Sequence, residues 1–176
     1  MESLIAAAME YGFTHCAPLA VDTIVVMPEV RQMCASDKCH AYNKSWSCPP
    51  ACGTLKECRK RLGCYNQGIL VQTVGTLEDC FDFESMVETE NLHKENFRRF
   101  HAHLRRLYPD LLAIGVGCCT LCRPCTYPDA PCRFPEEMTC SMEAYGMLVS
   151  QVCQDNGLAY SYGENTVTFT SCYLLR

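Results

Sequence analysis

The chain has 176 residues and a formal charge of −5 at pH 7, with 48% hydrophobic and 20% charged residues. These values exclude a disordered polymer, and the negative charge argues against a general nucleic-acid-binding protein. No stretch reaches the roughly 20 apolar residues of a membrane span, and the first residues lack the basic start of a signal peptide. We therefore expect a cytoplasmic protein with one domain over residues 1–176, without membrane or nucleic-acid partners.

In the first third of the chain, apolar periodicity and helix-start signals predict short elements. They are a helix over residues 2–11, an extended or partly strand segment over 13–26, a helix over 28–33 and a helix over 54–62. Pro28 suits the first turn of a helix, and Thr54 with Glu57 three residues later forms a capping box. Residues 34–53 lack periodicity and contain two prolines, so they form a loop.

In the rest of the chain, predicted strands and helices alternate. We expect a strand over residues 68–74, a helix over 76–108, a strand over 111–117, a helix over 141–157 and a hairpin over 158–175. Thr76 is the expected cap of the long helix, and Gly157 is expected to end the next one. The predicted fold class is α+β: a single domain with a small mixed sheet, flanking helices and two cysteine-rich metal-binding loops at about 34–58 and 118–135.

Sixteen cysteines are the unusual feature of the composition. Six fall within residues 34–64 and six within residues 118–140, and the other four are scattered. A domain of this size needs no cross-links, and nothing marks the chain for an oxidising compartment. Closely spaced thiols in a reducing compartment indicate metal binding rather than disulfides.

The second cysteine segment carries a C-x2-C-x2-C motif, and six residues separate its last cysteine from a further cysteine. Its predicted ligands are Cys119, Cys122, Cys125 and Cys132. This spacing is typical of a loop around a [4Fe–4S] cluster, whereas four-thiolate zinc sites are usually built from two separated knuckles. We therefore predict a [4Fe–4S] cluster, with zinc as the alternative. Cys118 and Cys140, the other thiols of this segment, are expected to pack rather than to bind metal.

The first cysteine segment is less regular, and spacing alone leaves open which thiols would form a site. The candidates are Cys34, Cys39, Cys48, Cys52, Cys58 and Cys64. Pro49 follows Cys48 directly, and because proline has no N–H, it stiffens the turn there. A site with three thiolates and one open iron position is an alternative, and a catalytic cluster needs such an opening.

Both segments resemble one family. The shared patterns are Arg31-x2-Cys34-x4-Cys39-x2-Tyr42-x3-Trp46-x-Cys48-Pro49-Pro50, Tyr65-x2-Gly68, Cys119-x2-Cys122-x2-Cys125, Pro131-Cys132-Arg133-x-Pro135 and Ser141-Met-Glu-Ala144-x-Gly146. Over residues 31–147 the chain is similar to the prokaryotic family called predicted metal-binding proteins (domain of unknown function 2284). The resemblance implies metal binding and a mainly anaerobic, prokaryotic setting, and it implies no reaction.

The resemblance also implies ligands, position by position. It favours Cys34, Cys39 and Cys48 in the first site and Cys119, Cys122, Cys125 and Cys132 in the second. We expect Cys58 as the fourth ligand of the first site, ahead of Cys52, because it lies on a short helix that could close over the loop.

Three functions fit these observations. The first is an electron-transfer protein or redox subunit with two [4Fe–4S] clusters and a redox partner protein. The second is an iron–sulfur enzyme that uses an open-site cluster on a small substrate. The third is a zinc-binding structural or assembly protein. We expect the first, because two cysteine motifs share a small domain that has few catalytic side chains.

Overall fold

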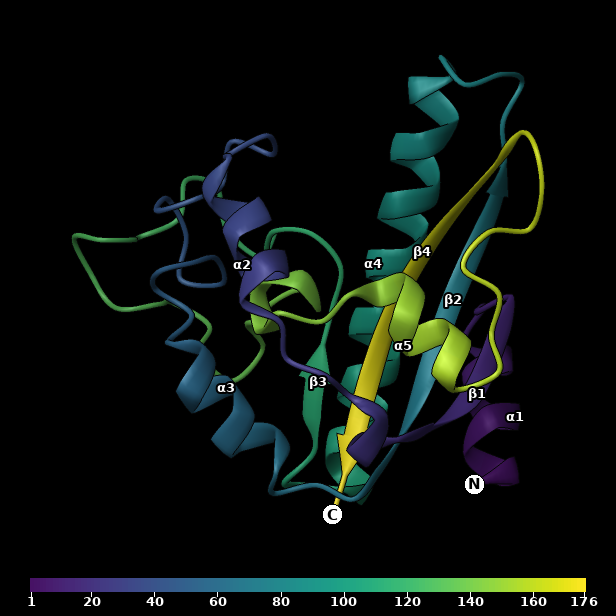
Figure 1. The fold of residues 1–176 in the computed structure, drawn as a ribbon, viewed down its shortest axis with the longest axis horizontal. Coiled ribbons are helices and arrows are strands. Elements are labelled where there is room, and N and C mark those ends of the chain that lie inside the picture. The colour runs from purple at the N-terminus through teal and green to yellow at the C-terminus, as the bar shows by residue number, and fades with distance from the viewer.

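The computed structural model describes residues 1–176 (Figure 1). In chain order its elements are α1 (Glu2–Glu10), β1 (His15–Ala20), the 3-10 helix η1 (Val21–Thr23), α2 (Pro28–Ala35), α3 (Leu55–Leu62), β2 (Gln67–Thr76), α4 (Phe83–Leu107), β3 (Leu112–Ile114), the 3-10 helix η2 (Glu143–Tyr145), α5 (Val149–Asp155) and β4 (Thr166–Leu175). The chain thus contains both helices and strands, and the strands form one sheet, which confirms the α+β class.

The four strands form one sheet in the order β1-β2-β4-β3. Every ladder between these strands is antiparallel, and the longest runs from Gln67 opposite Leu175 to Thr76 opposite Thr166. The only parallel pairing is an isolated bridge between Gly115 and Ser141, just beyond β3. This bridge lies outside the strands, so the sheet itself is antiparallel throughout and not mixed as predicted.

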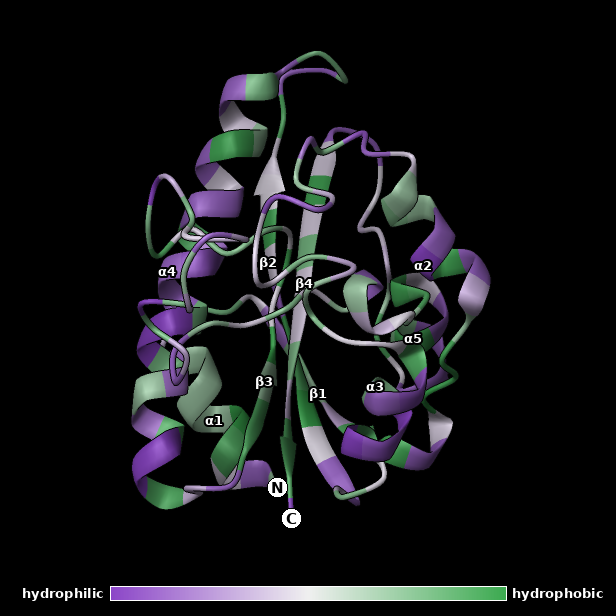
Figure 2. Ribbon diagram, turned by 90° about the vertical axis from the view of Figure 1, so that its left-hand side faces the viewer, coloured by the Kyte–Doolittle hydropathy of each residue, from purple (hydrophilic) through white to green (hydrophobic).

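The sheet lies between two layers of helices. Figure 2 shows α1 and α4 on one side of it and α2, α3 and α5 on the other. On β2, the side chains of Ile69 and Val71 join the core beneath α1 and α4, whereas Leu70 joins the opposite core. Because successive residues of a strand point to opposite faces, a strand covered on both faces is apolar on both.

The helices that carry the first cysteine segment begin as predicted. Pro28 stands in the first turn of α2. The hydroxyl of Thr54 accepts a hydrogen bond from the backbone N–H of Glu57, whose side chain accepts from the N–H of Thr54, so the capping box of α3 is confirmed. None of the helices combines the length and the apolar character that a bilayer crossing requires.

The prediction that Thr76 caps the long helix is wrong. Thr76 is the last residue of β2, because it still pairs with Thr166 of β4. The helix begins at Phe83, and its cap is Asp82, whose carboxylate accepts a hydrogen bond of 3.0 Å from the N–H of Ser85. A pairing partner distant in sequence thus prolongs the strand past the apparent helix start.

The predicted helix over residues 141–157 is interrupted. It consists of η2 and α5, separated at Gly146, which has a left-handed backbone with φ of 78°. The break lets the carbonyl of Gly146 accept a hydrogen bond of 2.7 Å from the N–H of Met27, and Met147 form a bridge with Val26. These contacts attach this segment to the start of α2.

The predicted terminal hairpin is also wrong, since residues 158–162 form no strand. β4 is a central strand with β2 and β3 as its neighbours, so neither of its edges is free for a hairpin partner. Residues 158–162 are held instead by Gln72, whose side chain donates to the carbonyl of Ala159 and accepts from the hydroxyl of Tyr162.

Candidate metal centres

The two cysteine segments meet on one side of the molecule. The loop after α2 and the loop after β3 lie side by side (Figure 1). The Ser47 hydroxyl accepts a hydrogen bond of 3.1 Å from the N–H of Cys119, and the Tyr127 hydroxyl donates one of 2.8 Å to the side-chain oxygen of Asn43. Thiols that are far apart in the sequence are therefore neighbours in the fold.

One thiol pair joins Cys48 of the first segment to Cys118 of the second. The buried Ser47 hydroxyl lies 3.7 Å from each sulfur, and the two thiols lie close enough to shift each other's pKa. The pKa of the Cys48 thiol is raised and that of Cys118 is lowered, because Cys48 is placed to donate a hydrogen bond and Cys118 to accept it. A metal ion that binds thiolates can displace a proton shared by two sulfurs.

A second pair joins Cys52 to Cys140. The proximity of the two thiols lowers the pKa of Cys52 and raises that of Cys140, because Cys140 is placed to donate a hydrogen bond, and burial raises the latter further. Both residues belong to the core between the sheet and the layer of α2, α3 and α5. Cys58 of α3 is buried in the same core, with 1% of its surface exposed.

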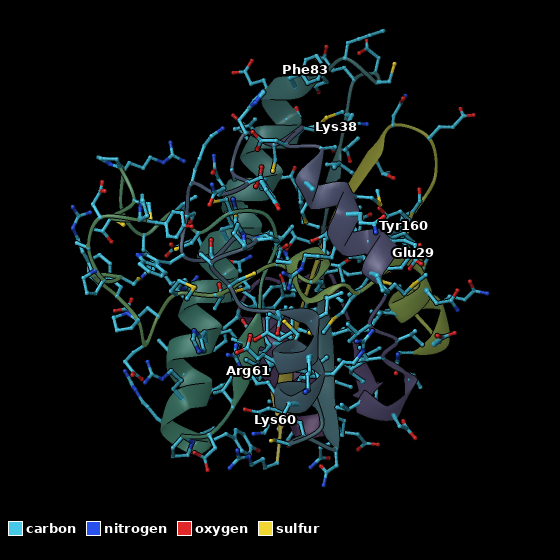
Figure 3. All side chains as sticks on the ribbon, turned by 60° about the vertical axis from the view of Figure 1, so that its left-hand side comes forward. Glu29, Lys38, Lys60, Arg61, Phe83 and Tyr160 are labelled. Atoms are coloured by element: carbon cyan, nitrogen blue, oxygen red, sulfur yellow. The ribbon has the colours of Figure 1, made fainter.

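Two arginines lie beside the second pair. The Arg31 guanidinium donates to the sulfur of Cys58 at 3.4 Å and to the carbonyl of Gly53 at 2.9 Å, while its buried Nε has no partner. Arg61 donates to the Tyr145 hydroxyl, and Figure 3 shows it on α3. Neither arginine belongs to any of the five salt bridges of the chain, so no carboxylate balances these two charges at contact distance.

The predicted ligands of the first site lie in two places. Cys58 is close to Arg31, and burial raises the pKa of Cys58 while the Arg31 charge opposes that shift. The half-buried Cys34 interacts electrostatically with Cys39 and Cys52. Cys48 belongs to the pair with Cys118, and Cys39 is exposed.

The predicted ligands of the second site all lie in the loop after β3 and are half-buried. They are Cys119, Cys122, Cys125 and Cys132. Cys119 is close enough to Cys122 and to Cys132 for their charges to interact. Burial raises the pKa of Cys119, and a backbone hydrogen bond from Leu121 opposes this shift.

All sixteen cysteines are free thiols, and no three Cys, His, Asp or Glu side chains converge closely enough to hold a metal ion as they stand. Sulfur donors nevertheless meet in pairs across the two segments, and the orphaned Nε of Arg31 lies beside them. Thiolates select zinc or iron–sulfur clusters, and each pair brings two of them together. The residues present therefore fit a thiolate-bound metal.

The sequence did not identify Cys118 and Cys140 as partners of the first segment. They stand at the two ends of the second segment, next to the bridge between Gly115 and Ser141 that anchors both ends to each other. In the sequence, only their position at the two ends of the second segment distinguishes Cys118 and Cys140 from its other cysteines. Nothing in the sequence marked Ser47, which contacts four residues of the two segments.

A pocket of about 540 Å³ lies between α4 and the segment that enters the second loop. Its lining includes Lys94, Arg98, His101, Arg105, Cys118 and Cys119. Burial and the nearby Arg105 lower the pKa of His101 to about 4. Each cation of the lining is ion-paired: Lys94 with Glu90, Arg98 with Glu95 and Arg105 with Glu136. The pocket gives small molecules access to the first thiols of the second segment.

Comparison with known proteins extends the similarity beyond the two motifs. No curated protein and no solved structure gives a significant match to the chain. The model of one family, described as "Predicted metal-binding protein (DUF2284)", matches residues 17–175. The match spans both cysteine segments, both thiol pairs and nearly the whole sheet. On this evidence the chain belongs to the DUF2284 family of metal-binding proteins.

Proposed function

We propose that the protein is an iron–sulfur protein that holds two [4Fe–4S] clusters and transfers electrons to a partner protein. The observation that carries the proposal is that the thiols of both cysteine segments lie side by side, as the hydrogen bond between Ser47 and Cys119 records. Two centres in these loops would be neighbours on the surface of one small domain. Such clusters supply one-electron transfer when bound.

The ligands of the second cluster are those that the C-x2-C-x2-C spacing predicts: Cys119, Cys122, Cys125 and Cys132. Those of the first come from the segment that begins at Cys34, where the sequence predicts Cys34, Cys39, Cys48 and Cys58. The chain contributes positive charge to this region, since the Arg31 guanidinium contacts the sulfur of Cys58. A cation and hydrogen-bond donors near the sulfurs reduce the cost of burying a negatively charged cluster and raise its reduction potential.

The loops also provide a route for electrons to leave. Cys39 is exposed, and so are Arg123, Pro124 and the residues on either side of Cys132. A partner that docks against these loops would therefore come close to both centres without any rearrangement of the sheet.

Metal analysis of protein purified without oxygen tests the proposal. Two clusters predict about eight iron and eight sulfide ions per chain and an EPR signal that appears on reduction. Stoichiometric zinc without sulfide would overturn the iron–sulfur proposal and favour a zinc-binding structural or assembly protein instead.

A second candidate function is an iron–sulfur enzyme that acts on a small substrate. It is favoured by the pocket of about 540 Å³, because Cys118 and Cys119 form part of its lining. An open-site cluster changes its EPR signal when cyanide or azide is added, whereas a cluster with four thiolates does not. If the added ligand changes the EPR signal of the wild type but not that of the variant Arg105→Ala, the ligand binds in this pocket. If it leaves the EPR signal of the wild type unchanged, this candidate function is excluded.

A further inference from the structure

We infer that Cys52, Cys58 and Cys140, with Cys34 as the fourth thiol, bind one metal centre that both cysteine segments share. The inference rests on the proposed function, because it assigns the ligands of one of its two centres. It departs from the sequence prediction, in which Cys39 and Cys48 accompany Cys34 and Cys58 while Cys140 only packs.

The contact between Cys52 and Cys140 is the first observation. Both residues are buried in one core cluster and each thiol shifts the pKa of the other, although one belongs to the first segment and the other ends the second. Cys52 is fixed by a backbone hydrogen bond of 3.1 Å from its N–H to the carbonyl of Cys48. Cys58 lies in the same core, and its sulfur interacts electrostatically with both of these thiols. Three thiols from two distant segments of the chain thus lie in one core cluster.

Charge provides the second, independent observation. Arg31 acts electrostatically on Cys34, Cys52 and Cys58, and Arg61 acts on Cys52, Cys58 and Cys140. Neither arginine forms a salt bridge, and the buried Nε of Arg31 has no hydrogen-bond partner. Arg31 is half-buried, and a partly buried guanidinium without an anion is costly, whereas Arg61 is exposed. Metal-bound thiolates carry net negative charge, so a centre here would balance the Arg31 guanidinium and attract that of Arg61.

The frame around these thiols is the third observation. α2 carries Cys34 and is attached to the segment after Cys140 by the hydrogen bond from Met27 to Gly146. α3 carries Cys58 and is attached to the start of α2 by Arg59, which donates a hydrogen bond of 2.7 Å to the carbonyl of Val26. Each of the elements that supplies a thiol is therefore tied to another, which is what a centre shared by distant segments requires.

Two alanine variants test the assignment against plain core packing. Cys140→Ala and Cys52→Ala each remove a thiol that the inference assigns to the centre and the sequence prediction does not. Cys172→Ala is the matched control, because Cys172 is fully buried in the same core but lies on β4, away from both loops. Cys58→Ala is expected to lose the centre under either assignment.

The readout is iron, sulfide and zinc per folded chain after purification without oxygen, together with EPR spectra. Cys140→Ala and Cys52→Ala are expected to lose one of two centres, so that metal content falls by about half, while Cys172→Ala keeps the wild-type content. Full metal content and an unchanged EPR spectrum in both variants would overturn the inference and leave the proposed function intact. A wild-type protein that binds no metal would instead refute the proposed function.

Where the variants fail to fold, alkylation of the wild-type protein tests whether Cys52, Cys58 and Cys140 bind the metal centre. Cys52, Cys58 and Cys140 are buried, so they react only through local opening, and they are expected to react faster after chelation than in the metal-loaded protein, as mass spectrometry of the labelled peptides would show. Cys172 should be protected in both states. If chelation leaves the labelling of Cys52 and Cys140 unchanged, the inference is wrong.

Discussion

The indole Nε1 of Trp46 donates a hydrogen bond of 3.0 Å to the carbonyl oxygen of Ala130. Each of these residues stands two positions before a cysteine, Cys48 in one loop and Cys132 in the other. The edge of the indole also meets the ring of Tyr127, with 4.9 Å between ring centroids. The only tryptophan of the chain therefore lies where the two cysteine loops touch, and its emission reports on this region.

Fluorescence of Trp46 is expected to be quenched in the metal-loaded protein, because iron–sulfur clusters absorb in the near ultraviolet and accept energy from a neighbouring indole. Removing iron with a chelator under anaerobic conditions should raise the emission. Protein reconstituted with zinc, which does not absorb there, serves as the control and should keep the high emission. An emission intensity that does not respond to iron removal would contradict the placement of a cluster in these loops.

Ser47→Ala should weaken the junction between the loops. The substitution leaves the N–H of Cys119 without its acceptor and removes a hydroxyl that lies 3.7 Å from the sulfurs of Cys48 and Cys118. An unsatisfied, partly buried donor costs about 1–3 kcal/mol, and urea unfolding should show a loss of that size.

Ser36→Ala is the control for this change. The hydroxyl of Ser36 is exposed and donates only to the carbonyl of Met33 in its own turn, so its loss should cost less than about 0.5 kcal/mol. Equal losses for the two variants would show that the Ser47 contacts do not support the loops.

Gly146→Ala should destabilise the fold more than Gly157→Ala. Both glycines have left-handed backbones, with φ of 78° and 73°, so each substitution carries a strain of about 1–2 kcal/mol. At Gly146 an added Cβ would also lie 2.9 Å from a methyl of Leu55 and 3.0 Å from the carbonyl of Met27, whereas at Gly157 nothing lies within 4 Å. We expect Gly146→Ala to cost about 1–3 kcal/mol more in thermal or urea unfolding. A smaller loss at position 146 than at 157 would contradict the packing of η2 against α2.

His93 should make the protein less stable in acid. The ring is fully buried between the hydroxyls of Thr73 and Ser171, and burial together with Lys94 lowers its pKa to about 3. The unfolded chain has the ordinary value near 6.5 and takes up a proton first as the pH falls. Below about pH 6.5 the free energy of unfolding should therefore fall by about 1.4 kcal/mol per pH unit from this one group, until the pH approaches 3.

The variant His93→Gln should remove this slope, because glutamine can still bond to both hydroxyls but does not titrate. The test compares urea unfolding of the variant and the wild type between pH 7 and pH 5. Asn91→Ala, a change at an exposed position of the same helix that carries no titratable group, is the control and should keep the wild-type slope. A parallel pH dependence in His93→Gln and the wild type would show that this ring is not the titrating group.

The elements that the sequence predicted are those whose signals are local. Thr54 and Glu57 bond to each other, so a window of four residues contains the whole capping box. Gly146 is different: the helix there breaks because of contacts with Met27 and Leu55, which no local pattern reveals. The place of β4 was missed for the same reason, since its pairing with β2 and β3 is non-local.

The candidate site also has parts that the sequence predicts and parts that it does not. The repeated spacing of Cys119, Cys122 and Cys125 predicts a metal-binding loop by itself, and the chain belongs to a family described as predicted metal-binding proteins. Spacing cannot reveal that Cys52 meets Cys140, because the fold of the sheet and of α2 brings them together. The distribution of ligands between two centres is therefore the part of the site that only the structure suggests.

The central position of β4 has a consequence for the order of events during biosynthesis. Both cysteine segments precede Thr166–Leu175 in the chain, so they leave the ribosome while the strand that completes their frame has not yet been made. Until then, the thiols belong to an incompletely folded sheet and are exposed to oxidants and to incorrect metal ions. We therefore expect metal insertion to follow the synthesis of β4, and the thiols to need a reducing environment until then.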